Sequence, residues 1–398
     1  MLLFLKDFTP DKENLAIGLM SGTSCDGLDI ALISVMEDHG ETHFRFLKGN
    51  SYPYSEEQVR YLKTLPLAEN SSAYSISQTN FYLAQIWAEM VNDFLRKNEL
   101  TPSEITIIGS HGHTLWHQSQ AQDLLGRNII STLQIGDPSV LAKLTGIPVI
   151  GDFRVGDMAF GGQGAPLIPY FDFIFFSRLK KKILAINIGG IANFTFIPRD
   201  GDINKVQGFD CGPGNMLLDQ AMADLFGEDY DQNGQIAFSG QLSDKLLDFL
   251  LESDGFINLP PPKSTGREYY GKAFYNRIKA FARQNDIKPE DVIHTLSFYT
   301  VMAIQMNYST FIAPHNGMPD IVVVSGGGAL NDFLIEQLKI QFADIPVRSS
   351  LEMGLDIDFK EAVGFAILAW STLLGRPSNV PGVTGANKAT VLGKICLP

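Results

Sequence analysis

The stretch Leu15-Ala-Ile-Gly-Leu-Met-Ser-Gly-Thr-Ser-Cys-Asp-Gly-Leu-Asp-Ile-Ala-Leu-Ile-Ser-Val35 holds two apolar strand patterns joined by a turn of small residues. This pattern predicts a β-hairpin whose turn runs from Ser21 to Gly27. The backbone N–H groups and hydroxyls of such a turn can surround a phosphate, and Asp26 is placed to hold Mg²⁺ through water. One hairpin by itself leaves a plain β-turn open as the alternative.

The same order of elements returns at Ile183-Leu-Ala-Ile-Asn-Ile-Gly-Gly-Ile-Ala-Asn-Phe-Thr-Phe-Ile197, where Gly189 and Gly190 form the turn. Two such hairpins, each opening a run of strands and helices, predict a duplicated α/β domain whose halves face each other across a cleft. We expect an N-terminal domain over residues 1–170 and a C-terminal domain over residues 171–398. The last helix and the tail are left free to pack back toward the first domain.

Composition narrows the class of protein. A chain of 398 residues with 45% hydrophobic content can bury more than one core, and its formal net charge of −13 without a basic stripe argues against a nucleic-acid partner. Its three cysteines are widely spaced and lack a C-x-x-C pattern, which favours a reducing cytoplasm. No segment has the length of a membrane span or a signal peptide. We expect a cytoplasmic protein, with a homodimer as one open option.

A third stretch, Gln207-Gly-Phe-Asp-Cys-Gly-Pro-Gly-Asn215, precedes an apolar helix pattern. A carboxylate at the end of a strand, next to a glycine turn and a helix N-terminus, places a possible general base beside backbone N–H groups that favour anions. Asp210 is that carboxylate. Turn chemistry alone leaves a simple strand-to-helix connection equally open.

An apolar strand over residues 320–325 runs into Gly326, Gly327 and Gly328 and then into a helix, which is a place where a ligand can lie against the backbone. No G-x-x-x-x-G-K-[ST] sequence occurs, so the chain has no Walker phosphate loop. A buried strand near residue 108 leads into three histidines at residues 111, 113 and 117. Metal binding there is a minor alternative to a loop that bonds a polar ligand. Residues 119–131 are predicted to form a loop.

Taken in order, the three glycine turns at 22–27, 189–190 and 326–328 resemble the phosphate-1, phosphate-2 and adenosine segments of the actin, sugar kinase and heat-shock chaperone superfamily. A closer resemblance, to the anhydro-N-acetylmuramic acid kinase family, extends over nearly the whole chain. Eight motifs carry it: Met20-Ser-Gly-Thr-Ser-Cys-Asp-Gly27, Gly109-Ser-His-Gly-His-Thr114, Gly151-Asp-Phe-Arg154, Gly161-Gly-Gln-Gly-Ala-Pro166, Asn187-Ile-Gly-Gly190, Gly208-Phe-Asp-Cys-Gly-Pro-Gly-Asn215, Lys263-Ser-Thr-Gly-Arg-Glu268 and Val383-Thr-Gly-Ala386.

The resemblance implies two actin-like, ribonuclease-H-like α/β domains with mixed sheets flanked by helices, facing across a nucleotide cleft. It also implies a cell-wall recycling enzyme that uses ATP, Mg²⁺ and water to convert 1,6-anhydro-N-acetylmuramic acid into N-acetylmuramic acid 6-phosphate. The general base would be Asp210. The ATP-binding residues would be Gly22, Thr23, Ser24, Cys25, Asp26, Gly27, Leu28, Asp29, Gly189, Gly190, Gly326, Gly327 and Gly328.

The expected sugar contacts are His111, Thr114, Asp152, Arg154, Arg267 and Glu361. Arg154 is the first choice for the lactyl carboxylate, because a guanidinium pairs with a carboxylate through two bonds, and Arg267 or Lys263 come next. The chain departs from the family at His113, where glutamine is usual, and at Gly151, where alanine is common. These departures and the segment 119–131 leave the fine sugar specificity open.

Two other functions remain alternatives at this stage. A phosphatase or polyphosphate hydrolase could use the same fold, but the chain lacks a basic groove for a phosphate chain. A non-catalytic sugar sensor could retain the site, but the intact Asp210 argues against it.

Overall fold

The computed structural model describes residues 8–22, 25–67, 69–356 and 358–398. The chain divides into two compact units, which are residues 1–174 together with 358–398 (unit 1) and residues 175–357 (unit 2). The last helix and the tail follow unit 2 in sequence but belong to unit 1.

Unit 1 is built on a mixed sheet with the strand order β12-β6-β4-β1-β2-β3, and β5 pairs with β4 at its side. The strands β1 to β3 form an antiparallel meander, and β4 and β6 run parallel to β1. The strand bounds are β1 (Asn14–Ser21), β2 (Gly27–Asp38), β3 (Glu41–Pro53), β4 (Ile105–Leu124), β5 (Arg127–Ile135), β6 (Val149–Gly151) and β12 (Lys394–Cys396).

One face of this sheet is covered by α2, whose Leu83, Trp87 and Val91 recur every four residues and are buried in the same core as Ile17. A shorter helix, α1, precedes α2 in the chain. The helix bounds are α1 (Glu56–Thr64), α2 (Ala73–Lys97), α3 (Pro138–Thr145), α4 (Phe153–Ala159), α5 (Ile168–Phe176), α14 (Lys360–Leu373) and α15 (Pro381–Thr384).

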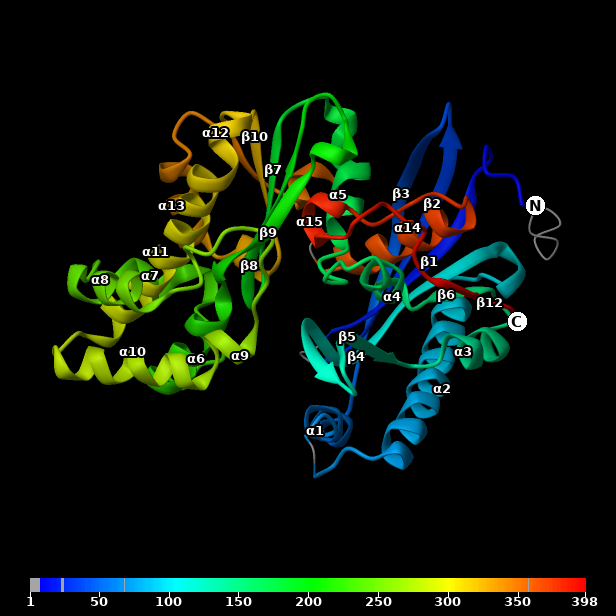
Figure 1. The fold of residues 1–398 in the computed structure, drawn as a ribbon, viewed down its shortest axis with the longest axis horizontal. Helices are drawn as coiled ribbons and strands as arrows, with labels where there is room; N and C mark the ends of the chain where they lie inside the picture. Colours follow the sequence, from blue (N-terminus) through cyan, green and yellow to red (C-terminus); the bar gives the residue numbers. More distant parts are fainter. Residues whose placement is uncertain (1–7, 23–24, 68, 357) are drawn as a thin grey trace. The chain divides into compact units, whose positions relative to one another are not determined.

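The opposite face of the sheet carries α14, which packs on β1, β2 and β4 (Figure 1). Two glycines allow its close approach. A Cβ atom on Gly18 would lie 1.7 Å from the carbonyl oxygen of Ala362, and one on Gly109 would lie 2.1 Å from that of Phe365. Any other residue at either position would push the helix off the sheet.

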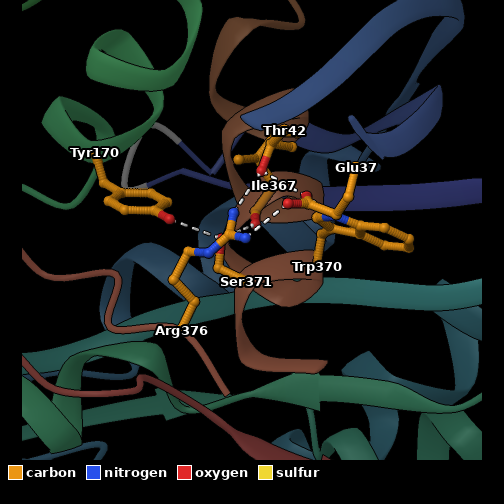
Figure 2. A network of polar contacts seen from close by, with 7 residues as sticks. All are labelled: Glu37, Thr42, Tyr170, Ile367, Trp370, Ser371 and Arg376. Carbon is orange, nitrogen blue, oxygen red and sulfur yellow. Dashed lines mark hydrogen bonds and ion pairs between the residues drawn. The ribbon is translucent and has the colours of Figure 1, made fainter. Parts of the chain in front are cut away.

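Polar contacts also join α14 and the segment after it to β2 and α5, as Figure 2 shows. The indole N–H of Trp370 donates to Glu37 at 2.8 Å, and the Arg376 guanidinium bonds the other oxygen of the same carboxylate at 2.6 Å. The hydroxyls of Tyr170 and Ser371 lie 3.0 Å apart. These contacts join residues of β2 and α5 to α14 and the segment just after it, at least 201 residues later in sequence, and they explain why α14 belongs to unit 1.

Unit 2 has a sheet with the strand order β11-β10-β7-β8-β9. Its strands are β7 (Ile183–Ile188), β8 (Ile191–Ile197), β9 (Gln207–Pro213), β10 (Ile321–Ser325) and β11 (Val347–Ser349). Side chains of α11 and α13 share one buried core with this sheet. The helices are α6 (Asn215–Leu225), α7 (Gln235–Ser239), α8 (Asp244–Ser253), α9 (Arg267–Tyr270), α10 (Lys272–Gln284), α11 (Pro289–Asn307), α12 (Ala313–Asn316) and α13 (Asp332–Gln341).

The two sheets share one topology. In each, a three-stranded antiparallel meander is followed by two strands that run parallel to its first strand, which gives the orders β3-β2-β1-β4-β6 and β9-β8-β7-β10-β11. This is the ribonuclease-H-like order, so the expected fold class of two such α/β units is confirmed. The nucleotide cleft between the halves stays a prediction.

The prediction of a loop over residues 119–131 is wrong. Strand β4 continues to Leu124, turns at Leu125 and Gly126, and returns as β5 with Leu124 opposite Arg127. Both turn residues have positive φ, at 54° and 78°, as the favoured two-residue hairpin turns require. Most side chains beyond His117 are exposed on both faces of the hairpin, so the sequence has no apolar alternation to mark a strand.

Within the described ranges, no helix combines the length and the apolar character that crossing a membrane requires.

Candidate active site

The glycine turn of unit 2 is bonded directly to the start of α6. The Gly189 carbonyl accepts a hydrogen bond from the backbone N–H of Asn215 at 2.8 Å, and the Gly190 carbonyl accepts one from the backbone N–H of Gly214 at 3.0 Å. A Cβ atom on Gly214 would lie 2.3 Å from the carbonyl oxygen of Gly189, so only glycine fits there. The second glycine turn and the Asp210 motif, which are separate in sequence, therefore form one surface.

The third glycine turn joins this surface. Gly326 has a left-handed φ of 79°, and a Cβ atom on it would lie 2.7 Å from the carbonyl oxygen of Ile188 at the end of β7. The side-chain amide of Asn215 donates to the same carbonyl at 3.3 Å. The five predicted glycines of unit 2 (Gly189, Gly190, Gly326, Gly327 and Gly328) thus lie together at the carboxyl ends of β7 and β10.

Two hollows lie along these turns. One of about 520 Å³ is lined by Gly327, Asn215, Leu218, Asp219, Asp229, Tyr230, Asp231, Gln232, Asn233, Leu330 and Asn331. The other, of about 440 Å³, is lined by Gly190, Met216, Asp219, Gln220, Arg267, Gly271 and Lys272. Asp219 lines both hollows, so they meet at its side chain. Burial raises the pKa of Asp219 to about 6, and the nearby Asp229 adds to the shift.

The sequence reasoning missed Asp219 and Tyr230. Asp219 stands four residues after Asn215, on the same face of α6, and that helical spacing from the motif is a signal that could have found it. Tyr230 lies in an irregular segment with no pattern of its own.

Asp210 lies in β9 with its side chain 9% exposed. Its Oδ2 accepts the backbone N–H of Thr265 at 2.8 Å. Burial raises the pKa of Asp210 to about 7, although the Thr265 bond and the Lys263 charge oppose that rise. A carboxyl with a pKa near neutrality is suited to take up and release a proton in a reaction.

The neighbours of Asp210 differ in their roles. Cys211 is fully buried, and burial raises the pKa of its thiol well above the ordinary value, so it packs as a thiol. Arg267 is exposed and lines the hollow beside Gly190. Lys263 is buried, and its ammonium donates to the carbonyls of Phe256 and Ile257, so it does not fit the role of a sugar contact.

In unit 1 the described ATP-binding residues predicted from the sequence lie in the turn after β1 (Gly22, Cys25 and Asp26) and in the first residues of β2 (Gly27, Leu28 and Asp29). Thr23 and Ser24 lie outside the described residues. The Asp26 side chain is exposed, whereas Asp29 is partly buried and accepts a bond from Ser51 at 2.5 Å. Burial raises the pKa of Asp29, and Asp26 and Asp358 add to the rise. Three carboxylates therefore gather near this turn.

The His113 side chain contacts two residues at this turn, Ser21 and Cys25. Its Nδ1 lies 3.2 Å from the Ser21 hydroxyl, and its Nε2 lies 3.8 Å from the Cys25 sulfur. His117 bonds Thr132 at 3.0 Å on the hairpin. The ring nitrogens thus have partners other than a metal, and the described ranges contain no group of three His, Cys, Asp or Glu residues that could hold one. The structure gives the histidine-metal alternative no support.

Arg154, at the start of α4, is held by two acceptors. Its Nε and Nη2 point at the Nε2 of His111, at 3.2 and 2.8 Å, and its Nη1 donates to the carbonyl of Gly164 at 2.7 Å. Burial, and then the charge of Arg154, hold the pKa of His111 well below its ordinary value, so the ring is a neutral acceptor. Burial lowers the pKa of Arg154 to about 10, which leaves the guanidinium charged.

The described residues therefore commit three of the five Arg154 donors and leave 5 − 3 = 2. Two donors are what a carboxylate needs for a bidentate pair. Glu361, in the first turn of α14, has an exposed side chain, and the charge of Arg154 favours its ionised form.

Of the other predicted sugar contacts, Asp152 binds the Lys394 ammonium at 2.6 Å and Thr114 accepts from Gln134 at 3.3 Å. Unit 1 thus brings His111, Arg154 and Glu361 together, and neither Asp152 nor Thr114 bonds to them.

Comparison with known proteins shows which protein family the sequence matches. The family model for anhydro-N-acetylmuramic acid kinase matches residues 14–398. A curated protein of that name from Caldanaerobacter subterraneus is 39% identical over 388 residues, covering 97% of this chain and 98% of its own. One from Salinibacter ruber is 36% identical over 382 residues, with 96% of each chain covered.

Solved structures are more distant. The activator of 2-hydroxyisocaproyl-CoA dehydratase from Clostridium difficile with bound ADPNP has a TM-score of 0.43 at 12% identity, covering 90% of this chain and 95% of that one. A ROK family glucokinase from Streptomyces griseus in complex with glucose and AMPPNP has a TM-score of 0.38 at 14% identity, covering 89% and 99%.

Proposed function

Because the chain belongs to the anhydro-N-acetylmuramic acid kinase family, we propose that it uses ATP and water to open 1,6-anhydro-N-acetylmuramic acid and phosphorylate O6, giving N-acetylmuramic acid 6-phosphate in cell-wall recycling. The observation that carries this proposal is Asp210, a buried carboxyl with a pKa near 7 beside three joined glycine segments. A general base and a phosphate-binding surface are the two parts that the reaction needs.

In the proposed reaction, Asp210 takes a proton from a water molecule whose oxygen bonds to C1 of the sugar. The C1–O6 bond breaks as the water oxygen attacks C1, and the released O6 bonds to the γ-phosphorus of ATP. The bond from that phosphorus to the β-phosphate oxygen breaks, and ADP leaves. One base therefore serves both ring opening and phosphoryl transfer, and the rest of the site acts by holding the reactants in line.

The nucleotide is assigned to the glycine turns and the hollows of unit 2. Glycine has no side chain, so a phosphate can approach the backbone N–H groups of these turns closely. The hollow next to Gly190 is also lined by the cations Arg267 and Lys272. The hollow next to Gly327 has room and amide groups for a nucleoside. Asp26 would hold Mg²⁺ through water, and its exposed carboxylate fits, because Mg²⁺ in kinases takes few protein ligands. The ion would neutralise phosphate charge.

The sugar is assigned to His111, Arg154 and Glu361 of unit 1. The two free donors of Arg154 suit the lactyl carboxylate, and the neutral His111 ring keeps the guanidinium in place. Roles for Thr114 and Asp152 in sugar binding stay predictions.

The function is tested by incubating the protein with ATP, Mg²⁺ and the anhydro sugar and following the sugar by mass spectrometry. We expect a product heavier by one water and one phosphoryl group, and in ¹⁸O-water the label should enter at C1. Phosphate release without a sugar product would instead support the hydrolase, and sugar binding without turnover would support the sensor. Either outcome would overturn the kinase proposal.

The pH dependence of the reaction follows from Asp210. A general base must be unprotonated, so kcat/KM is expected to rise about tenfold per pH unit below pH 7 and to level off above it. Initial rates from about pH 5.5 to about pH 9 at saturating ATP would measure this profile. A rate that is flat across neutrality would remove Asp210 as the titrating base.

Arg267 offers a test of which ligand occupies its hollow. If it binds the ATP phosphates there, Arg267→Gln should raise the KM for ATP about tenfold and leave the KM for the sugar within about twofold. The reverse pattern would assign Arg267 to the sugar carboxylate, as the sequence analysis expected. Arg277→Gln, whose side chain packs on Phe274 of α10, is a matched control and should leave both values unchanged.

A further inference from the structure

The ammonium of Lys263 lies in a cage of three phenyl rings. It is 4.8 Å from the ring centre of Phe256, 5.4 Å from that of Phe311 and 5.6 Å from that of Phe209. Phe311 is presented by a π-helical turn, Tyr308–Ile312, that follows α11. Ring faces attract a cation, and two carbonyls, Phe256 at 3.2 Å and Ile257 at 3.0 Å, accept its protons. The lysine is only 6% exposed, so these groups replace its water.

The main chain next to this cage holds Asp210 on two sides. The Asp210 N–H donates to the Lys263 carbonyl at 3.3 Å, and the Thr265 N–H donates to Oδ2 of Asp210 at 2.8 Å. The three prolines at 260–262 cannot donate backbone hydrogen bonds, so the segment before Lys263 has few bonds of its own. The segment is therefore held to β9 by these two bonds and by the contact of the Lys263 ammonium with the Phe209 ring, and the same ammonium ties it to the turn at residues 256 and 257.

A buried carboxylate orders the turn that supplies the two carbonyls. Asp254 is 1% exposed, and its Oδ2 accepts the hydroxyls of Tyr270 and Tyr299, both at 2.7 Å. Its Oδ1 accepts the backbone N–H of Phe256 at 3.0 Å. Contacts thus run from Asp254 through the turn to Lys263 and on to Asp210.

The charged and titratable groups around this assembly are few. Asp210 faces Lys263, Glu268 and Cys211, and Lys263 faces Asp210, Cys211 and Asp254. Lys263 is the one cation among them, and burial lowers its pKa to about 8, so the ammonium is still mostly charged at pH 7. Its charge favours the ionised form of Asp210, whereas the charge of Glu268 opposes that form.

We propose that Lys263 is a positioning residue for Asp210: its caged ammonium holds residues 263–265 against β9 and supplies the buried positive charge beside the base. It does not contact the sugar. The inference rests on the proposed function only for the role of Asp210 as the base. The arrangement keeps Asp210 oriented by Thr265 and ready to lose its proton near neutral pH.

The test is Lys263→Met in the full chain, because methionine is an unbranched side chain one atom shorter than lysine and suits an aromatic cage without carrying charge. We expect the pKa of Asp210 to rise by about one unit. This pKa would be measured by ¹³C-carboxyl NMR of aspartate-labelled protein, and the Asp210 signal would be identified as the one missing from Asp210→Asn. The kcat at pH 7 should fall about fivefold and recover at higher pH, with the KM for ATP unchanged. Lys279→Met, which removes a surface partner of Asp224, is the control.

An Asp210 pKa that stays within about 0.3 units of the wild-type value would overturn the proposal, as would a loss of kcat that is equal at every pH. If Lys263→Met fails to fold, Lys263→Arg keeps the charge and should keep the wild-type pKa, and a shifted pKa in that variant counts against the proposal. The NMR titration needs no turnover. A wild-type protein that fails to phosphorylate the sugar would therefore refute the function while leaving this test intact.

Discussion

Asp210→Asn is expected to lower the turnover of the anhydro sugar by at least about 10²- to 10⁴-fold and to leave ATP affinity within about twofold. An amide cannot take the proton of the attacking water, whereas its oxygen can still accept the Thr265 N–H that now binds Oδ2 at 2.8 Å. The side chain keeps its size in a site that is 9% exposed, so the surrounding packing should stay as it is.

Turnover would be measured by product formation and ATP affinity by calorimetry, with Asp224→Asn as the matched control. Asp224 is also an aspartate of unit 2, but it bonds Lys279 and Tyr275 at the surface. The control should retain wild-type rates. Wild-type turnover in Asp210→Asn would remove this carboxylate from the mechanism, and loss of ATP binding would show a wider disturbance.

Stability supplies a second readout for the same variant. The pKa of Asp210 is about 7 in the folded chain and about 3.9 in an unfolded one, so the folded state binds the proton more tightly. The stability that this carboxyl contributes is therefore present below about pH 4 and is lost as the pH rises through about 7. At about pH 8 the wild type holds a buried charge that the asparagine variant lacks. The variant should then melt at the same temperature as the wild type or higher.

Local turn chemistry explains why so much could be predicted from the sequence. A glycine turn after an apolar strand carries its structural reason within a few residues, and the bonds from Gly214 and Asn215 to the Gly189–Gly190 turn act through backbone alone. The repeated hairpin likewise predicted a duplicated α/β domain, and the two sheets have the same topology. For such features the neighbouring residues determine the conformation.

Features made by distant residues could not be predicted in this way. The cage of Lys263 draws its rings from β9, from the turn after α8 and from the π-helical turn after α11, and no local pattern distinguishes a buried lysine from an exposed one. The apolar sequence of α14 indicates burial but does not say which sheet it covers. The hairpin at 119–131 is exposed, so its residues show no alternation of apolar and polar side chains. Hydrophobic periodicity could therefore not predict that the end of β4 pairs with β5.

The pairing of Arg154 with His111 belongs to the same class, and it sharpens the role of the arginine. A guanidinium that donated all its N–H groups to carboxylates of the protein would have none left for a ligand, whereas Arg154 donates to a neutral imidazole and a carbonyl and keeps two. The sequence analysis chose Arg154 by its residue type. The structure adds the two acceptors that leave it with two free donors.

Arg154→Met is expected to raise the KM for the anhydro sugar about 10- to 100-fold, because it removes a charge-assisted bidentate bond of about 1.5–3 kcal/mol. The KM for ATP should be unchanged. Arg154→Lys should recover only part of the loss, since an ammonium restores the charge without the planar pair of donors. Arg45→Met, at an exposed arginine of unit 1, is the matched control.

The assignment to the lactyl carboxylate is tested by a second substrate, 1,6-anhydro-N-acetylglucosamine, which lacks that group. If Arg154 binds the carboxylate, the wild type should favour the muramic sugar by a factor that Arg154→Met loses, because the cycle of two substrates and two proteins isolates the one contact. A variant that weakens both sugars equally would instead assign Arg154 to a part of the ring that the two share. A discrimination that survives in the variant would place the carboxylate against another cation, and the KM values of Arg267→Gln would then show whether it is that one.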